Sequence, residues 1–225
     1  MSRARHPLYW SLLTLALLLA AAGRVGALDL DSILASSPYP PADRASIRSL
    51  FTEFHAMHIP AEILLPRLAE GAAKRIPLAR IEAVLREDAR FLERARAALA
   101  SAPEGSALIA DQAAWALTAT LLETGASVSD ISALAIASRG ESRPYRMGGV
   151  LYASLMAWGL SRERALKVTR SALRSSLPPE QLPGIVNLFE QGRHMAIPPD
   201  RLAGRLIDVL PSVRNIEDLR RAVLY

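Results

Sequence analysis

The chain contains no cysteine and only two lysines, Lys74 and Lys167, among its 225 residues. Without cysteine it can form no disulfide, no thiolate metal site, no haem attachment and no lipid-modified cysteine. It also lacks a Gly-rich phosphate loop, a Gly-x-Ser-x-Gly motif and an aromatic-plus-basic nucleic-acid surface. Its hydrophobic content of 51% is enough to bury a core, which excludes disorder throughout.

Arginine therefore supplies nearly all of the positive charge. Lys and Arg together number 27 against 22 Asp and Glu, a formal net charge of +5, and such an excess ordinarily suggests an anionic partner. Arg3, Arg5 and Arg24 lie in the first 27 residues, and removing that segment leaves 24 basic and 22 acidic residues, or +2. The charge of the remaining chain thus gives no reason to expect a nucleic-acid partner.

The first 27 residues have the three parts of a secretory signal. Arg3 and Arg5 form a basic start, Leu8–Ala22 is an uncharged apolar run, and Val25–Ala27 offers small residues to a signal peptidase. The run is shorter than the roughly 20 apolar residues of a spanning helix. We predict a signal peptide over residues 1–27 and export to the periplasm or the outside of the cell, with an uncleaved membrane tether as the alternative.

No later segment is predicted to span a membrane. The longest uncharged stretch after the signal, Met147–Ser161, is interrupted by glycines and is too short in its apolar part. We expect it to be a buried helix of a soluble mature protein.

Most of the mature chain has the pattern of one-sided helices. Alanine and leucine, which favour helices, make up a third of the chain, and apolar residues recur three and four positions apart rather than in alternation. We expect helices near residues 43–57, 60–73, 77–100, 106–124, 129–138, 149–158, 161–175, 179–193, 198–210 and 215–224.

A short phrase recurs at the expected helix starts: an apolar residue, then Pro or Ser, then polar groups, then a new apolar run. Proline suits a first helical turn, serine can cap one, and an apolar residue before the cap can pack back onto the helix. The phrases begin at Ile59, Ile76, Val128, Leu160, Leu177 and Ile197. Residues 59–85 and 177–210 also resemble each other, which suggests a duplicated helical hairpin, although any protein of short helices reuses Pro and Ser in this way.

These patterns predict an all-α protein of short helical hairpins, stacked as a small solenoid-like or irregular helical bundle after the signal peptide. Residues 28–42, with Ser-Ser-Pro-Tyr-Pro-Pro, are expected to be a Pro-rich leader. Residues 43–225 are expected to be a single all-helical domain, with residues 101–106 as the best place for a subdivision.

The densest polar cluster lies between two apolar helices, in the segment 138–149. It holds the candidate binding residues Arg139, Glu141, Arg143, Tyr145 and Arg146. Three arginines on one loop could grip a carboxylate or phosphate, and the following Gly148 and Gly149 would let a ligand approach the backbone. A solvated connector whose charges pair with one another is the alternative.

One catalytic possibility arises in the same cluster. An Ala-rich helix leading into Glu141–Ser142, with Leu155–Met156 downstream, resembles the catalytic Glu-Ser and Gly-Leu-Met elements of lytic transglycosylases. The resemblance covers about a tenth of the chain, lacks the Gly and Gln of the downstream element, and has Arg143–Pro144 interrupting the helix that carries the acid. It implies a glycan-cleaving enzyme with Glu141 as general acid, although three neighbouring arginines favour the charged carboxylate instead.

Metal and cofactor chemistry finds little support in the sequence. His55 and His58 are spaced so that they could share a metal, but no matching third histidine follows, since His194 is isolated. We expect no metal site and no cofactor. The sequence thus favours an exported module that binds or scaffolds another envelope protein over an enzyme, and it indicates neither the partner nor the oligomeric state.

Overall fold

The computed structural model describes residues 29–225, so the signal peptide predicted over 1–27 lies outside the described residues. Within them all regular structure is helical: twelve α-helices and two short 3₁₀ segments, and no strand. The all-α prediction is therefore confirmed for this part of the chain. No helix of residues 29–225 combines the length and apolar character needed to cross a membrane.

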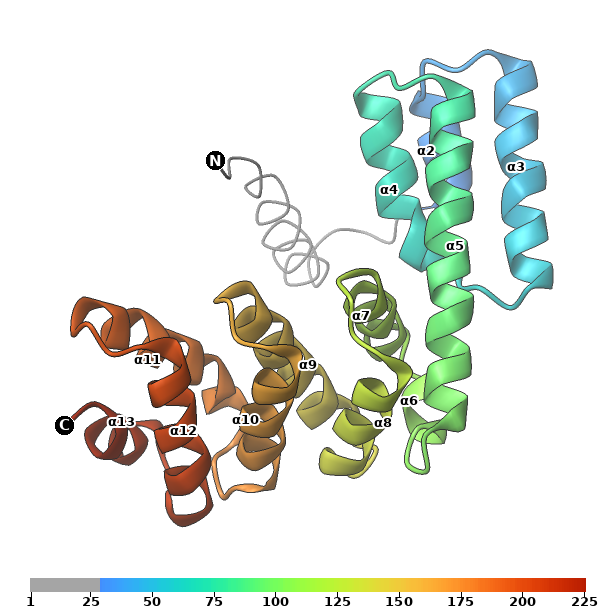
Figure 1. The fold of residues 1–225 in the computed structure, drawn as a ribbon. Helices are drawn as coiled ribbons and strands as arrows, with labels where there is room; N and C mark the ends of the chain where they lie inside the picture. Colours follow the sequence, from blue (N-terminus) through green and yellow to red (C-terminus); the bar gives the residue numbers. More distant parts are fainter. Residues whose placement is uncertain (1–28) are drawn as a thin grey trace. The chain divides into compact units, whose positions relative to one another are not determined.

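The chain divides into two compact units between Arg90 and Phe91, within helix α5. Unit 1 holds α2 (Leu30–Ser36), α3 (Pro41–Ala56), α4 (Ala61–Ala73) and the first part of α5 (Leu78–Ser101) (Figure 1). Unit 2 holds the rest of α5 and the later elements: α6 (Ser106–Ile109), α7 (Gln112–Glu123), α8 (Val128–Ala137), α9 (Ser142–Ala157), α10 (Arg162–Arg174), η1 (Pro179–Gln181), α11 (Leu182–His194), α12 (Pro199–Val209), η2 (Leu210–Ser212) and α13 (Ile216–Leu224). This boundary precedes residues 101–106, the break that the sequence suggested.

Unit 1 has a core of its own. The apolar stripe of α3, including Leu50, Phe51 and Phe54, is buried, and the rings of Phe51 and Phe54 meet edge to face with centroids 5.7 Å apart. Helix α4 contacts both α2 and α3. The stripe that the sequence pattern predicted therefore faces a core, as amphipathic helices require.

The segment expected to be a Pro-rich leader contains a helix. Asp29 caps α2 by accepting a hydrogen bond from the Ser32 N–H (3.1 Å), and Leu34 is fully buried. The Pro-rich turn that follows is also ordered by contacts, because the Tyr39 hydroxyl donates to the Ile76 carbonyl (2.8 Å). The prediction of a leader over 28–42 missed α2 because a seven-residue helix is too short to show a repeating apolar pattern.

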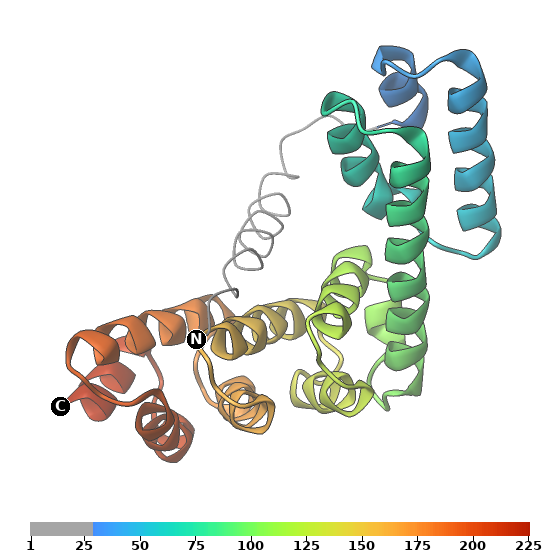
Figure 2. The ribbon, with the colours of Figure 1, turned by 45° about the horizontal axis from the view of Figure 1, so that its top comes forward.

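Unit 2 is built from helices that pack on their next-but-one neighbours. Helix α9 contacts α7 and α11, α10 contacts α8 and α12, and α13 packs on α11 and α12. Figure 1 and Figure 2 both show α10 between α8 and α12. From α7 onward, successive hairpins of unit 2 are thus in contact with one another.

The recurring sequence phrase has a structural role that differs in part from the predicted one. Six helices end with a residue in the left-handed region, at positions 58, 75, 125, 139, 159 and 196. The next residue then donates a backbone hydrogen bond to the carbonyl five residues earlier, as Ile197 N–H does to Gly192 (2.8 Å) and Leu160 N–H to Leu155 (3.2 Å). This is the Schellman arrangement. In most of the sequence phrases, the leading apolar residue donates the hydrogen bond that ends one helix. The same residue stands just before the cap of the next helix.

The sequence phrase expected to begin at Val128 in fact begins two residues earlier in the chain. The cap of α8 is Ser127, whose side chain accepts from the Asp130 N–H, while the Asp130 carboxylate accepts from the Ser127 N–H. Val128 is therefore the first residue of α8 rather than the apolar residue before the cap. The true phrase begins at Ala126, whose N–H closes α7 on the Leu121 carbonyl (2.9 Å).

Ala196 allows a direct test of the helix-ending geometry. Its φ of 56° is unfavourable for a residue with a Cβ, by about 1–2 kcal/mol. We expect Ala196→Gly to raise the free energy of unfolding by about 1 kcal/mol, measured by denaturant titration. The matched change Ala97→Gly, at an exposed position inside α5, should lower it by about 1 kcal/mol. Equal destabilisation by both changes would contradict the left-handed assignment.

Candidate functional site

Most of the polar segment 138–149 is helical, and only residues 138–141 form a turn. Helix α8 ends at Ala137, and Glu141 already stands at the N-terminal boundary of α9, which begins at Ser142. The expected start at 149 was wrong by seven residues. Pro144 does not interrupt this helix, because it falls in the first turn, where no N–H is needed for the helical ladder. Arg143, Tyr145 and Arg146 are thus helical residues with fixed directions.

Tyr145 points into the protein. Its side chain is fully buried, and its hydroxyl shares a 2.7 Å hydrogen bond with the buried Thr118 hydroxyl of α7. Burial raises the pKa of the Tyr145 hydroxyl to about 12, although its hydrogen bond with the Thr118 hydroxyl acts in the opposite direction. Tyr145 therefore joins α9 to α7 and has no surface to offer a partner.

The arginines of α9 pair with acids outside the cluster. Arg143 forms an ion pair with Glu180 of η1 at 2.5 Å, and Arg146 forms one with Asp111, just before α7, at 3.4 Å. Arg139 and Glu141 are exposed. The structure therefore does not direct the five candidate side chains toward one common ligand, and the charges that do pair are not paired within the cluster.

The two glycines that follow serve helix packing. A Cβ at Gly148 would lie 2.7 Å from Leu173 of α10, and one at Gly149 would lie 2.6 Å from Leu117 of α7. Both distances are shorter than a carbon contact allows. The expected approach of a ligand to this backbone is wrong, because neighbouring leucine side chains occupy that space.

The surroundings of Glu141 do not match those of a general acid. A glycan-cleaving enzyme holds that carboxyl in an apolar environment, which favours the protonated form. Glu141 is exposed at the start of α9. Among residues 29–225, moreover, no three His, Asp or Glu side chains are grouped so that they could hold a metal ion, and this includes His55 and His58.

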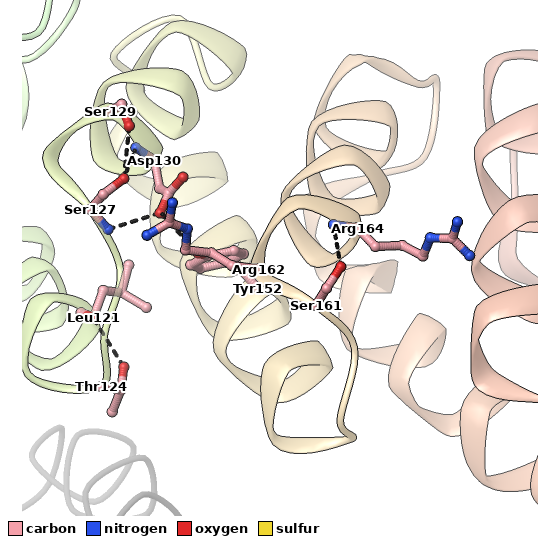
Figure 3. Close-up of polar contacts among 9 residues, drawn as sticks. All are labelled: Leu121, Thr124, Ser127, Ser129, Asp130, Tyr152, Ser161, Arg162 and Arg164. Carbon is pink, nitrogen blue, oxygen red and sulfur yellow. Dashed lines mark hydrogen bonds and ion pairs between the residues drawn. The ribbon is translucent and has the colours of Figure 1, made fainter.

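The structure assembles a different polar centre, around Asp130 of α8 (Figure 3). The Asp130 side chain is only 8% exposed. Its Oδ2 accepts hydrogen bonds from the Ser127 N–H (2.8 Å) and the Tyr152 hydroxyl (3.2 Å), and it lies 3.4 Å from Nε of Arg162. One carboxylate thus holds the start of α8 to the middle of α9 and to the first residue of α10.

Tyr152 is the buried partner in this centre. Burial is the main cause that raises the pKa of the Tyr152 hydroxyl, and the adjacent Asp130 carboxylate raises it further. The sequence contained one sign of the centre, since Ser127-x-x-Asp130 has the spacing of a capping box. It contained no sign of Tyr152 or Arg162, which lie 22 and 32 residues further along the chain.

A second ion pair repeats the connection one hairpin later. Nη1 of Arg164, in the first turn of α10, lies 3.1 Å from the Asp200 carboxylate and 3.0 Å from the Asp200 carbonyl, in the first turn of α12. Arg162 and Arg164 therefore extend from the start of α10 in two directions. The three helices α8, α10 and α12 are joined at their N-terminal ends.

The buried tyrosine of α9 predicts a pH dependence. Because the pKa of Tyr145 is about 12 in the folded chain and near 10 in the unfolded chain, unfolding releases a proton between these values. The stability from this residue is complete below pH 10 and decreases as the pH rises toward 12, by about 3 kcal/mol in all. Tyr145→Phe should flatten the decrease measured by urea unfolding from pH 9 to 12. Curves of equal slope for the two proteins would contradict this assignment.

Comparisons of the chain with protein-family models, with curated proteins and with solved structures found no match.

Proposed function

We propose that the chain is an exported helical-repeat protein that binds or scaffolds another protein of the cell envelope, in the periplasm or outside the cell. The observation that carries the proposal is the pair of ion pairs that join α8 to α10 and α10 to α12. Both connect first turns, so the three helices run in the same direction and the hairpins follow one another in register. A repeated unit of this kind is the basis of a solenoid-like stack.

The arrangement supports binding more than chemistry. Stacked hairpins present an extended surface along which a partner can lie. Two of the four charged side chains that the sequence singled out are used in pairs between helices, with Arg143 on Glu180 and Arg146 on Asp111. We do not propose the glycan-cleaving alternative, because no contact places Glu141 in a buried, apolar environment.

Export is tested by the N-terminus of the mature protein. We expect the chain isolated from its native host to begin at Leu28 and to be found in the periplasmic or extracellular fraction, because signal peptidase would cleave after Ala27. The measurement is N-terminal sequencing of the fractionated protein. A chain that keeps residues 1–27 in the membrane would establish the tethered form instead, and one that stays in the cytoplasm would refute export.

Binding is tested by affinity purification of an epitope-tagged chain from the native envelope. We expect one envelope protein to co-purify in a fixed ratio, because a binding module occupies its partner at equilibrium. A tagged chain without residues 1–27, which remains in the cytoplasm, is the control and should not recover that protein. If the exported chain recovers nothing beyond the control, the binding proposal is refuted.

A further inference from the structure

The outer face of α8 differs from an ordinary solvated helix surface. Val128 is 50% exposed and Ile136 is 43% exposed. The side chains between them on this surface are small, and the only charged residue of α8, Asp130, is buried. We define the α8 face by its residues: Val128, Ser129, Ser132, Ala133 and Ile136. It carries no charge over the whole length of the helix.

The side of this face that carries Val128 and Ser132 lies away from α10. Successive residues of an α-helix are about 100° apart around its axis, so Val128 and Ser132, each two residues from Asp130, lie roughly opposite it. Asp130 is the residue that meets Arg162 of α10. Helix α8 is thus covered by α10 on one side, as α10 is covered by α12, while Val128 and Ile136 of the α8 face remain exposed.

The next helix of the row shows what solvated residues look like in the same protein. The exposed residues of α10 include Glu163, Lys167 and Arg174, and Lys167 pairs with Glu163 at 2.9 Å. The α10 surface thus carries the charges typical of a surface that faces water. The uncharged α8 face has a composition that suits contact with protein.

Arg139 gives the α8 face a charge at one end. It follows the last residues of α8 with a φ of 56°, in a turn held by the hydrogen bond from Gly140 N–H to the Ala135 carbonyl (3.0 Å). It is exposed, and it takes part in none of the ion pairs found within residues 29–225, unlike Arg143 and Arg146. A partner would therefore meet a neutral ridge that ends in a cation.

We propose that the α8 face docks an amphipathic helix of a partner protein. This inference rests on the proposed binding function and names its surface. Val128, Ser132 and Ile136 are four residues apart and form one ridge, which fits between the ridges of another helix. An acidic residue of the partner helix pairs with Arg139 at the end of the ridge.

A second copy of this chain fits the α8 face less well. Two copies with antiparallel α8 helices would bring each Arg139 to the N-terminal end of the other α8, where the helix dipole is also positive. Two copies with parallel α8 helices would bring the two Arg139 side chains together. Both arrangements are repulsive, which favours a different chain that carries an acid.

Site-specific photocrosslinking in the native host tests the proposal. Benzoylphenylalanine is placed at Val128 or at Ile136, and at Lys167 on the charged surface of α10 as the matched control. We expect adducts from the α8 positions to be about tenfold more abundant than from Lys167. Mass spectrometry should locate them in one amphipathic helix of another protein. Circular dichroism and thermal unfolding confirm that each substituted chain is folded.

A charge reversal then tests the role of Arg139. Arg139→Glu should reduce the adduct at Ile136 by about fivefold, the effect of losing an exposed pair worth about 1 kcal/mol, and replacing the partner's acid by Arg should restore it. Adducts from Lys167 alone would overturn the α8 assignment while leaving the binding function standing. An adduct with a second copy of this chain would overturn the stated occupant, and no adduct from any position would overturn both proposals.

Discussion

Replacing Gly140 by alanine is expected to lower the free energy of unfolding by about 3–4 kcal/mol, as measured by denaturant titration. Two effects add. Gly140 has a φ of 68°, which costs a residue with a Cβ about 1–2 kcal/mol. The new Cβ would also lie 2.5 Å from the carbonyl oxygen of Glu104, and a backbone atom cannot rotate away as the end of a side chain can.

Gly125→Ala separates the two effects. Gly125 has a φ of 101°, but a Cβ there meets no atom within 4 Å. Its expected loss is therefore only the conformational part, about 1–2 kcal/mol. If Gly140→Ala is no more destabilising than Gly125→Ala, the turn before α9 does not pack against residue 104 as described.

Asp130→Ala is expected to destabilise the protein by about 3 kcal/mol. The change removes a capping interaction worth about 1 kcal/mol, deprives the buried Tyr152 hydroxyl of its acceptor, and leaves Arg162 without its ion-pair partner. A buried polar group that loses its partner costs about 1–3 kcal/mol. Thermal and denaturant unfolding of the variant would measure the loss.

Two matched changes show which part of the Asp130 contact matters. Ser161→Ala removes an exposed cap that accepts only from the Arg164 N–H (3.3 Å), so a loss of about 1 kcal/mol is expected. Tyr152→Phe in the Asp130→Ala background should restore part of the lost stability, because it removes the unpaired hydroxyl. A loss at Asp130 no greater than that at Ser161 would show that the connection among α8, α9 and α10 contributes little.

The helices of the mature chain were largely predictable, because they are marked locally. Proline, serine and asparagine at helix starts place α3, α4, α10 and α13 within two residues of the expected limits. These signals act within one or two turns of chain, so they do not depend on tertiary contacts. Pro183 behaves in the same way: it lies at the second residue of α11, so it begins that helix and does not bend it.

The errors occurred where the local signals conflict or stop. The first two turns of α9 contain Arg143, Pro144 and Arg146, a composition typical of a loop, yet Tyr145 is buried against α7 and holds the segment as helix. The single helix expected over 106–124 is divided at Asp111, which caps α7 by accepting from the Ala113 N–H (2.9 Å). Neither tertiary burial nor the choice between two caps can be read from apolar spacing alone.

The candidate site also shows that local sequence predicts some features whereas tertiary contacts decide others. Arg139, Glu141, Arg143, Tyr145 and Arg146 are neighbours in sequence. However, α9 turns about 100° per residue and sends Arg143, Tyr145 and Arg146 in different directions, while Arg139 and Glu141 lie before its first residue. Asp130, Tyr152 and Arg162 are distant in sequence and meet within one polar centre. Closeness in sequence therefore predicted a polar cluster in the segment 138–149 that does not form. It did not predict the polar centre around Asp130.

By itself the sequence determined the helical class, the limits of most helices and the absence of any cysteine-based link. Those properties depend on residue type and on contacts within a few positions of the chain. The tertiary structure decided which polar residues meet, which helix face stays uncovered and where the chain divides. These outcomes depend on the packing of helices far apart in sequence, such as α10 between α8 and α12, and the pattern of one helix does not specify which neighbour will cover it.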